Sequence, residues 1–218
     1  DVRAEGVALG ADGQWATPSS PASLFFVTCP NAPTGRGYAT DTVAGFCRSF
    51  PGVVVIDEAY ADFAEADCME LALTLGNVLV TRSLSKSYSL AGARLGHAVG
   101  PAPLIRALDA IRDSYNVNAL SQAVGVAALE DRAHWRRNRE RVLATRARLT
   151  AGLEALGFTV APSSTNFVWA RPAGASAEAL FAALRERGIV VRYFPGAVTG
   201  EHLRISVGTD ADIDRLLE

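Results

Sequence analysis

The first residue that could do chemistry is a lysine. Of the 21 basic residues in this 218-residue sequence, 20 are arginines and one, Lys86, is a lysine. Arginine stays protonated up to about pH 12, whereas a lysine, with an ordinary pKa near ~10.4, can lose its proton and attack a carbonyl carbon. A surface lysine kept by chance is the alternative interpretation, so the weight of Lys86 depends on its neighbours.

Those neighbours belong to a pattern of polar residues that follow apolar, β-rich runs. The runs are residues 24–29, 53–56 and 77–81, and the polar residues after them are Asn31, then Asp57 and Tyr60, then Ser83 and Lys86. In open α/β sheets, ligands bind beyond the carboxyl ends of the strands. Each position alone has a structural explanation, because an aspartate can cap a helix and the PNAPTG segment can be only a turn. The three together predict a binding site at one sheet edge.

The elements that position these residues alternate along the chain. Residues 40–50 predict a helix with Thr40 as its N-cap, and residues 53–56 predict a buried parallel strand. The further strands expected are 94–99, 159–160, 166–170, 189–192 and 203–206, and the further helices are 103–114, 119–156 with a break near Asp131, 177–186 and 210–217. This order predicts an α/β fold with a mainly parallel sheet and flanking helices, followed by a smaller C-terminal α+β domain. We place the boundary between residues 1–130 and 131–218.

Composition narrows the class of protein. Hydrophobic residues make up 49% and charged residues 20%, with a net charge of −2, which is typical of a soluble globular protein. The arginine-rich stretch 132–148 could suggest nucleic-acid binding, but its acidic neighbours favour a solvated helix face. No apolar run approaches a membrane span, and the three histidines lack metal-ligand spacing. The three cysteines form no CxxC motif, so we expect reduced thiols and a cytoplasmic protein. From the charge and the lack of a long apolar run, we expect neither nucleic-acid nor membrane partners.

Taken in order, the motifs resemble a known family. NAPTG at residues 31–35, DEAY at 57–60 and SLSK at 83–86, followed by Arg94, are similar to the motifs of fold-type I aminotransferases. Within that group the chain most resembles the histidinol-phosphate aminotransferases, also through DSYNVN at 113–118 and LRISVG at 203–208. Cys29 and Ala32 depart from the residues usual in the family. The likeness covers nearly the whole chain but corresponds to the C-terminal part of the family's chain, so we expect an incomplete large domain.

The resemblance implies pyridoxal 5'-phosphate (PLP) as cofactor and assigns it a set of residues. Lys86 would bind the cofactor as a Schiff base and transfer the proton during catalysis, while Asp57 would face its pyridine nitrogen. Asn31 and Tyr60 would contact the phenolic oxygen. The cofactor phosphate would be bound by Ser83, Ser85 and Arg94.

The resemblance also suggests substrate contacts. Arg204 would bind the substrate carboxylate, Arg192 is our candidate for a substrate phosphate, and Asn31 would contribute to substrate binding as well. Each has a structural alternative, since Arg192 and Arg204 could be surface arginines at strand ends, Tyr60 a core residue and Ser85 part of a turn.

The expected function is amino transfer between histidinol phosphate and a 2-oxo acid, 2-oxoglutarate, by a homodimer. An aromatic-amino-acid aminotransferase and a threonine-phosphate decarboxylase share the scaffold and stay open. The alternative to an enzyme is a truncated chain that keeps part of the fold and has no activity.

Overall fold

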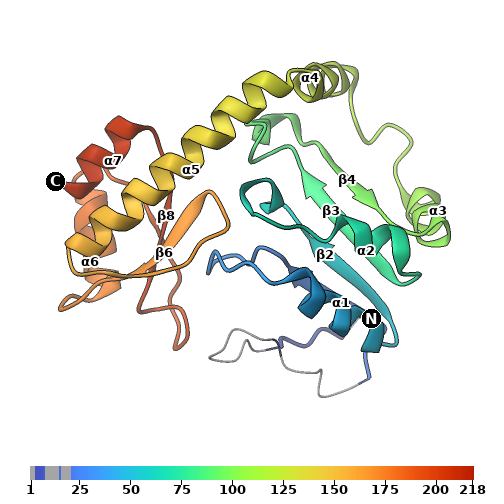
Figure 1. The fold of residues 1–218 in the computed structure, drawn as a ribbon, viewed down its shortest axis with the longest axis horizontal. Helices are drawn as coiled ribbons and strands as arrows, with labels where there is room; N and C mark the ends of the chain where they lie inside the picture. The colour runs from blue at the N-terminus through green and yellow to red at the C-terminus, as the bar shows by residue number, and fades with distance from the viewer. Residues whose placement is uncertain (1–2, 8–14, 16–20) are drawn as a thin grey trace.

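The computed structural model describes residues 3–7, 15 and 21–218, and it contains two four-stranded sheets. The first has the order β1-β2-β3-β4 (Figure 1). Its strands are β1 (Leu24–Thr28), β2 (Val53–Asp57), β3 (Val78–Ser83) and β4 (Gly96–Val99). The first three strands are parallel and β4 is antiparallel to β3. Parallel neighbours carry the carboxyl ends of β1, β2 and β3 to the same edge.

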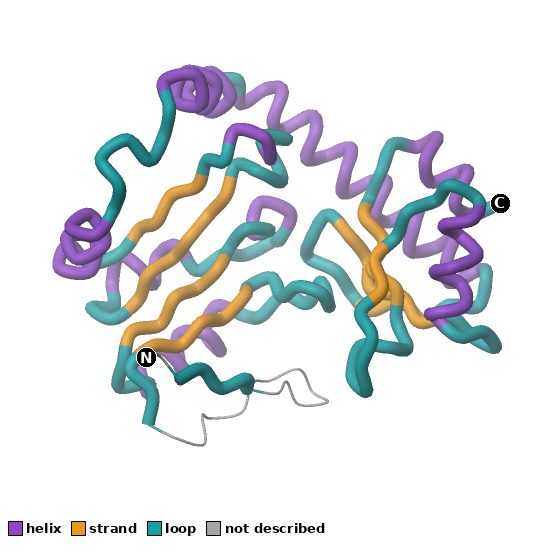
Figure 2. The backbone as a smooth tube through the Cα atoms, turned by 180° about the vertical axis from the view of Figure 1, so that it is seen from behind, coloured by secondary structure: helices purple, strands orange, loops and turns teal. Residues whose placement is uncertain are grey.

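One face of this sheet is covered by α1 (Thr40–Ser49) and α2 (Met69–Thr74). Successive side chains of β1 point to opposite faces of the sheet. Phe25 and Val27 are therefore buried in the core against these helices, while Phe26 on the other face is 68% exposed. Strands and covering helices are seen from behind in Figure 2.

Three helices connect the two sheets: α3 (Ala102–Ile111), α4 (Ala119–Glu130) and α5 (Arg132–Ala155). The expected break near Asp131 is confirmed, and Asp131 is the N-cap of α5, where its carboxylate accepts a hydrogen bond from the His134 amide at 3.0 Å. Helix α5 runs diagonally across the molecule from α4 to the second sheet (Figure 1).

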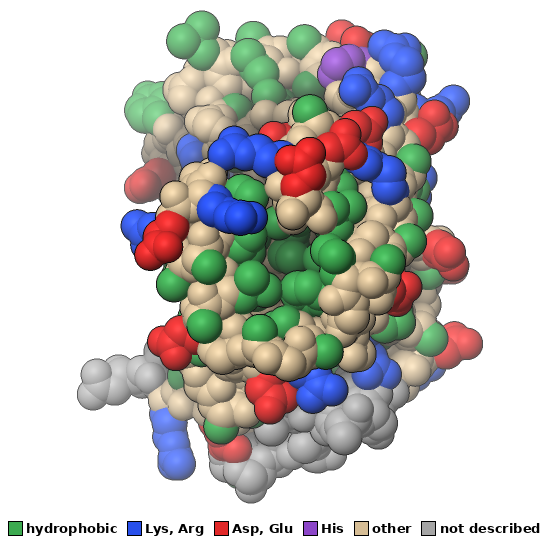
Figure 3. All heavy atoms as spheres, turned by 90° about the vertical axis from the view of Figure 1, so that its left-hand side faces the viewer, with side chains coloured by type: hydrophobic (Ala, Val, Ile, Leu, Met, Phe, Trp, Pro, Cys, Tyr) green, Lys and Arg blue, Asp and Glu red, His purple; other side chains and the backbone are tan. Residues whose placement is uncertain are grey.

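The second sheet is antiparallel, with the order β5-β6-β8-β7. Its strands are β5 (Thr159–Ala161), β6 (Phe167–Arg171), β7 (Arg192–Tyr193) and β8 (Leu203–Ser206). Helices α5, α6 (Ala177–Glu186) and α7 (Asp210–Leu217) contribute to its core. One face of the molecule is hollowed near its middle, and hydrophobic side chains gather in the hollow (Figure 3).

The α/β fold class is confirmed, with local corrections. Ala39, not Thr40, is the N-cap of α1, because the Thr40 hydroxyl donates instead to the Asp67 carbonyl at 3.0 Å. The strand expected at 189–192 is wrong for most of its length, since β7 begins only at Arg192. Helix α2 and the 3₁₀ turns η1 (Ala61–Phe63) and η2 (Ala91–Ala93) were not expected. In the part of the chain that the structure describes, no helix is long and apolar enough to cross a membrane.

Candidate functional site

Lys86 lies in a tight segment directly after β3. The Ser85 amide donates to the Ser83 hydroxyl at 3.0 Å, and the buried Ser87 hydroxyl donates to the Asp62 carboxylate. These bonds hold the segment on both sides of Lys86. The lysine itself is half-buried, and its Nζ lies 5.3 Å from the centroid of the Tyr60 ring. No ion pair ties its amine to a carboxylate among the residues described.

A row of contacts leads from Lys86 across to the second sheet. The Tyr60 ring meets Phe167 of β6 edge to face, with centroids 5.2 Å apart. The guanidinium carbon of Arg204, on β8, lies 5.0 Å from the centroid of the same Phe167 ring. The fold thus places a lysine from one sheet and an arginine from the other beside a single pair of aromatic rings. Sequence analysis missed Phe167, because no local pattern marks it.

Arg204 also has a cationic neighbour. Arg192 on β7 is its direct register partner, and both guanidinium carbons lie over the Phe194 ring, at 5.4 Å for Arg192 and 5.5 Å for Arg204. The Nε of Arg204 is buried and has no hydrogen-bond partner among the described residues. Like charges on directly opposed strand positions repel, and a buried unpaired donor costs free energy. An anion bound between the two arginines would relieve both penalties.

Asp57 and Asn31 lie together at the carboxyl ends of β2 and β1. Asp57 is half-buried, flanked in register by Thr28 and Thr81, and its Oδ1 accepts from the Ala59 amide at 3.0 Å. Its Oδ2 accepts no hydrogen bond from any described residue. The side-chain Nδ2 of Asn31 donates to the Thr28 hydroxyl at 2.8 Å, and its Oδ1 accepts from the Thr34 hydroxyl at 2.7 Å.

Arg94 is less closely associated with the other site residues. It is exposed, has a left-handed backbone with φ of 55°, and donates from Nη1 to the Ala91 carbonyl at 3.0 Å. The next carbonyl, of Leu95, accepts from the Leu84 amide at 3.0 Å, which puts the Arg94 backbone beside the end of β3. Among the described residues, no contact joins its guanidinium to Lys86 or Asp57.

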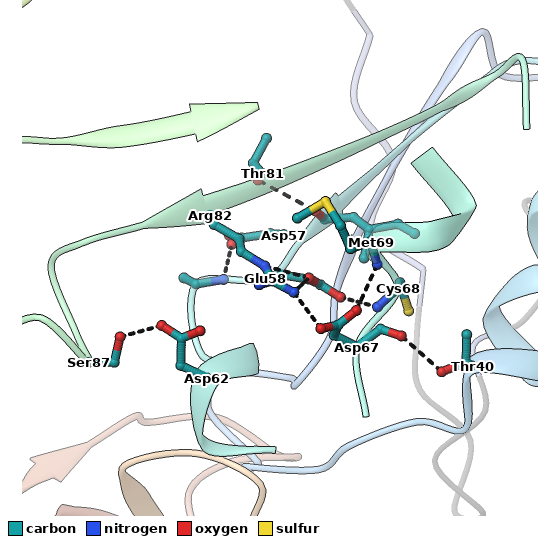
Figure 4. A network of polar contacts seen from close by, with 12 residues as sticks. Thr40, Asp57, Glu58, Asp62, Asp67, Cys68, Met69, Thr81, Arg82 and Ser87 are labelled. Carbon is teal, nitrogen blue, oxygen red and sulfur yellow. Dashed lines mark hydrogen bonds and ion pairs between the residues drawn. The ribbon is translucent and has the colours of Figure 1, made fainter. Parts of the chain in front are cut away.

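A buried ion pair next to Asp57 was not anticipated. Glu58 is only 2% exposed and accepts from Arg82 Nε at 2.9 Å and Nη2 at 2.7 Å, while Arg82 also pairs with Asp67 at 2.8 Å (Figure 4). Burial raises the pKa of Glu58, and the bonds from the Cys68 amide and Arg82 only partly oppose it. No local sequence signal predicts the pair, because it depends on the register between β2 and β3, which matches Asp57 with Thr81 and so sets Glu58 beside Arg82. This network anchors the backbone that presents Asp57.

The expected solvated face of α5 is wrong at two arginines. Arg139 donates to the carbonyls of Asp62 and Ala64, the latter at 3.2 Å. Arg146 donates to the Thr165 carbonyl at 2.7 Å and to Phe63 at 3.4 Å. Helix α5 passes over η1, whose carbonyls need donors once they are removed from water. These arginines join the segment that carries Tyr60 to the second sheet.

The comparisons with known proteins agree with this geometry. The profile of the class I and II aminotransferases matches residues 11–218. A histidinol-phosphate aminotransferase from Chromohalobacter salexigens is 42% identical over all of this chain and 64% of its own length. One from Synechocystis is 45% identical over 90% of this chain and 56% of its own length. The chain therefore spans about three fifths of the curated relatives it matches.

Solved structures give the same result in three dimensions. The histidinol-phosphate aminotransferase from Sinorhizobium meliloti, in complex with pyridoxal-5'-phosphate, superposes with a TM-score of 0.84 at 30% identity, covering 90% of this chain and 55% of that one. An aminotransferase-like protein from Burkholderia pseudomallei superposes with a TM-score of 0.82 at 33% identity, over 97% of this chain and 66% of its own. By sequence motif, profile and fold, this chain belongs to the class I and II aminotransferase family.

Proposed function

We propose that the protein is a PLP-dependent aminotransferase that moves an amino group between histidinol phosphate and 2-oxoglutarate. The observation that carries the proposal is the arrangement around Tyr60 and Phe167, with the amine of Lys86 on one side and the incompletely bonded Arg204 on the other. The Lys86 amine can attack the aldehyde of the cofactor, and Arg204 can bind an anionic group of the substrate. A site for an amino substrate needs both groups. Membership of the aminotransferase family supports the same reaction.

The residues present fit PLP by the chemistry of their free groups. The cofactor has an aldehyde, a pyridine nitrogen, a phenolic oxygen and a phosphate. Among the residues that the structure describes, the amine of Lys86 has no ion-pair partner and one carboxylate oxygen of Asp57 is free to accept from a protonated nitrogen. Tyr60 can donate to the phenolic oxygen, and so can Asn31 through the second hydrogen of its amide. The fit is weakest at the phosphate, where Arg94 must leave the Ala91 carbonyl to act with Ser83 and Ser85.

Bound PLP supplies an electron sink for the electron pair released when a bond to the substrate α-carbon breaks. The residues of this chain control the protons. Asp57 keeps the pyridine nitrogen protonated, because a carboxylate stabilises the cationic ring. Lys86, once its amine is free, takes the proton from the substrate α-carbon as a general base. Tyr60 limits the positions that the amine can reach, since Nζ already rests over its ring.

The arginine pair accounts for substrate choice. Histidinol phosphate has a phosphate and no carboxylate, whereas glutamate has carboxylates and no phosphate. We propose that Arg204 binds the phosphate in one half-reaction and a carboxylate in the other, with Arg192 beside it for the more highly charged phosphate. Guanidinium groups accept both anions through paired hydrogen bonds.

A panel of amino donors tests the proposal. The chain, with PLP and 2-oxoglutarate, is incubated with histidinol phosphate, phenylalanine or threonine phosphate, and glutamate and carbon dioxide are measured. Glutamate formation fastest with histidinol phosphate is the expected result. Preference for phenylalanine would indicate an aromatic aminotransferase, and carbon dioxide from threonine phosphate a decarboxylase. No product from any donor would contradict the proposal for this chain.

We also propose a homodimer in the cytoplasm. The free and buried state of Cys29, Cys47 and Cys68 is what a reducing compartment favours. Exposed apolar side chains on β1, α3 and α4 offer surface for a second copy, among them Phe26, Ile111 and Leu120.

A further inference from the structure

The half-buried ring of Phe194, directly after β7, lies against both arginines of the candidate substrate site. The guanidinium carbon of Arg192 is 5.4 Å from its centroid, and that of Arg204 is 5.5 Å away. A guanidinium within about 6 Å of an aromatic centroid is attracted by the negative face of the ring. One ring therefore holds two like charges that stand opposite each other in the register of β7 and β8.

The Phe194 ring is itself supported by the second sheet. It packs at a tilt of 49° against Trp169 of β6, with centroids 6.1 Å apart. Trp169 is 5% exposed, and the His202 ring stacks on it at 4.9 Å with an interplanar angle of 7°. Because Trp169 is packed into the sheet, it gives the Phe194 ring a fixed support beside the arginines.

The two arginines depend on Phe194 to different extents. Arg204 is half-buried on β8, between two neighbouring strands, and Phe167 gives it a second aromatic contact at 5.0 Å. Arg192 is exposed on the edge strand β7, and Phe194 is the only ring within cation–π distance of it in the part of the chain that the structure describes. Removing the Phe194 ring should therefore free Arg192 while Arg204 stays over Phe167.

We propose that Phe194 is a positioning residue that gives the arginine pair its preference for phosphate over carboxylate. A carboxylate has one negative charge and two oxygens, which Arg204 can bind alone through paired hydrogen bonds. A phosphate group carries nearly two charges and more acceptor oxygens, so a second guanidinium fixed beside the first increases its affinity.

Phe194 supplies that second guanidinium by restricting Arg192 to the place next to Arg204. An arginine already held in its binding position loses less side-chain freedom when the anion binds. The inference rests on the proposed role of the two arginines in substrate binding, and it adds the residue that sets the selectivity of the pair.

Anion titrations test the inference without turnover. The 218-residue chain carries Arg94→Ala, so that the arginine proposed for the cofactor phosphate does not contribute. Dissociation constants for inorganic phosphate and for acetate are measured by NMR from the signals of β8. Phe194→Leu should weaken phosphate binding about 3- to 10-fold, through the loss of cation–π contacts, and acetate binding less than about 2-fold. Phe194→Tyr keeps the aromatic face and should retain both affinities.

A double-variant cycle identifies the arginine through which the ring acts. With Arg192→Ala already present, Phe194→Leu should cause no further loss of phosphate affinity, because the side chain that it positions is gone. Equal losses for phosphate and acetate, additive losses in the double variant, or unchanged phosphate binding in Phe194→Leu would each overturn the inference.

A measurement on the native ring covers the case in which Phe194→Leu folds poorly, which circular dichroism reveals. In the Arg94→Ala chain, nuclear Overhauser effects should join the Phe194 ring to the Arg192 side chain before and after phosphate is added. Their absence would overturn the inference without any change at residue 194.

The panel of amino donors tests the proposed function separately. Phosphate preference that depends on Phe194, without amino transfer from any donor, would reject the proposed function and support the inference. Phosphate affinity that Arg192→Ala leaves unchanged would overturn the inference, whatever the panel shows.

Discussion

At the scale of single residues, the arginine on β8 is the most constrained. Arg204 has a buried Nε that finds no hydrogen-bond partner in the described part of the chain, a cation opposite it in register, and an aromatic ring beneath its guanidinium. Lys86 is constrained in a complementary way, because its Nζ lies over the Tyr60 ring and its amine forms no ion pair with any residue that the structure describes. Two cations so placed are costly for a protein that binds no anion or aldehyde between them.

Lys86→Arg should abolish covalent attachment of PLP while leaving the fold intact, because guanidinium cannot form a C=N bond with the aldehyde. Borohydride reduction after mixing with PLP should fix the cofactor on the Lys86 peptide of the parent, as judged by mass spectrometry. Circular dichroism of both proteins provides the control for folding. Cofactor fixed to any side chain of the variant would contradict the assignment, since the sequence has no other lysine.

Arg204→Ala should lower kcat/KM for histidinol phosphate and for glutamate by similar factors, about 10- to 100-fold, because one charged hydrogen-bond donor is lost from each half-reaction. Arg192→Ala is the matched variant, and it should raise KM chiefly for the phosphorylated donor. Single-turnover measurement of each half-reaction separates the effects. A loss confined to glutamate in Arg204→Ala would reject the idea that one arginine serves both anions.

At the scale of elements, the contact between α5 and the segment of residues 60–64 connects the two sheets. Arg139 and Arg146 reach carbonyls on both sides of it, and Ser164 donates its amide to the Gly35 carbonyl at 2.7 Å. Gly35 has φ of +79°, and a Cβ there would lie 2.8 Å from the Ser163 hydroxyl. Only glycine fits this close approach between the NAPTG turn and the loop before β6.

Arg146→Ala should lower the free energy of unfolding by about 1–3 kcal/mol, because the carbonyls of Thr165 and Phe63 lose a charged donor. Arg141→Ala on the same helix is the control, since Arg141 is exposed and should change stability by no more than about 0.5 kcal/mol. Urea unfolding monitored by tryptophan fluorescence gives both values. Equal stability of the two variants would mean that these carbonyls are solvated in the native state.

His97 should make stability depend on pH. Although the His97 side chain is exposed on β4, partial desolvation by its surroundings lowers its pKa below the ordinary value of 6.5. The positive charge of Arg82, its register partner, lowers it further, and Asp62 opposes the shift. Between the folded pKa and 6.5 the unfolded chain binds more protons, so the free energy of unfolding falls as the pH falls through that window and is fully retained above it.

His97→Gln should flatten this decline relative to the parent, and His134→Gln on α5 is the matched histidine control. Urea unfolding at about pH 8 and about pH 5.5 measures the difference. His202, whose pKa burial also lowers, contributes equally to both variants and cancels from the comparison. The same slope in all three proteins would assign the pH dependence elsewhere.

At the scale of the whole molecule, two cores are connected through α3, α4 and the long helix α5. We propose that the division lies between residues 130 and 131, where α4 ends and Asp131 caps α5. The first sheet is covered by α1 and α2 on one face, but Leu24 and Phe26 remain 47% and 68% exposed on the other. Exposed apolar side chains on an edge strand favour association.

Phe26→Lys should therefore reduce self-association of the 218-residue chain without loss of stability, because a charged side chain on an edge strand opposes pairing. Sedimentation velocity over a range of concentrations measures the effect. Val198→Lys, which replaces an 87% exposed residue in the loop after β7, is the matched control and should associate as the parent does. Unchanged association of Phe26→Lys would place the contact surface elsewhere, for example on α3 and α4.

By itself, the sequence determined the order of elements and the candidate chemistry at the strand ends. The single lysine, the aspartate after a buried strand and the serine-rich turn can be recognised locally, because apolar periodicity depends on near neighbours and reactivity depends on residue type. The break at Asp131 follows from the same local rules. Helix α2 escaped prediction because six residues carry too little periodicity to distinguish a helix from a turn.

Only the tertiary structure decided which of these residues meet. Phe167 stands between Tyr60 and Arg204 because α5 docks one sheet against the other, and no local pattern encodes a contact between such distant segments. The same docking gives Arg139 and Arg146 carbonyl partners in place of solvent. The Glu58–Arg82 pair depends on strand register. Local sequence determines what a side chain can do, whereas long-range packing determines its partners.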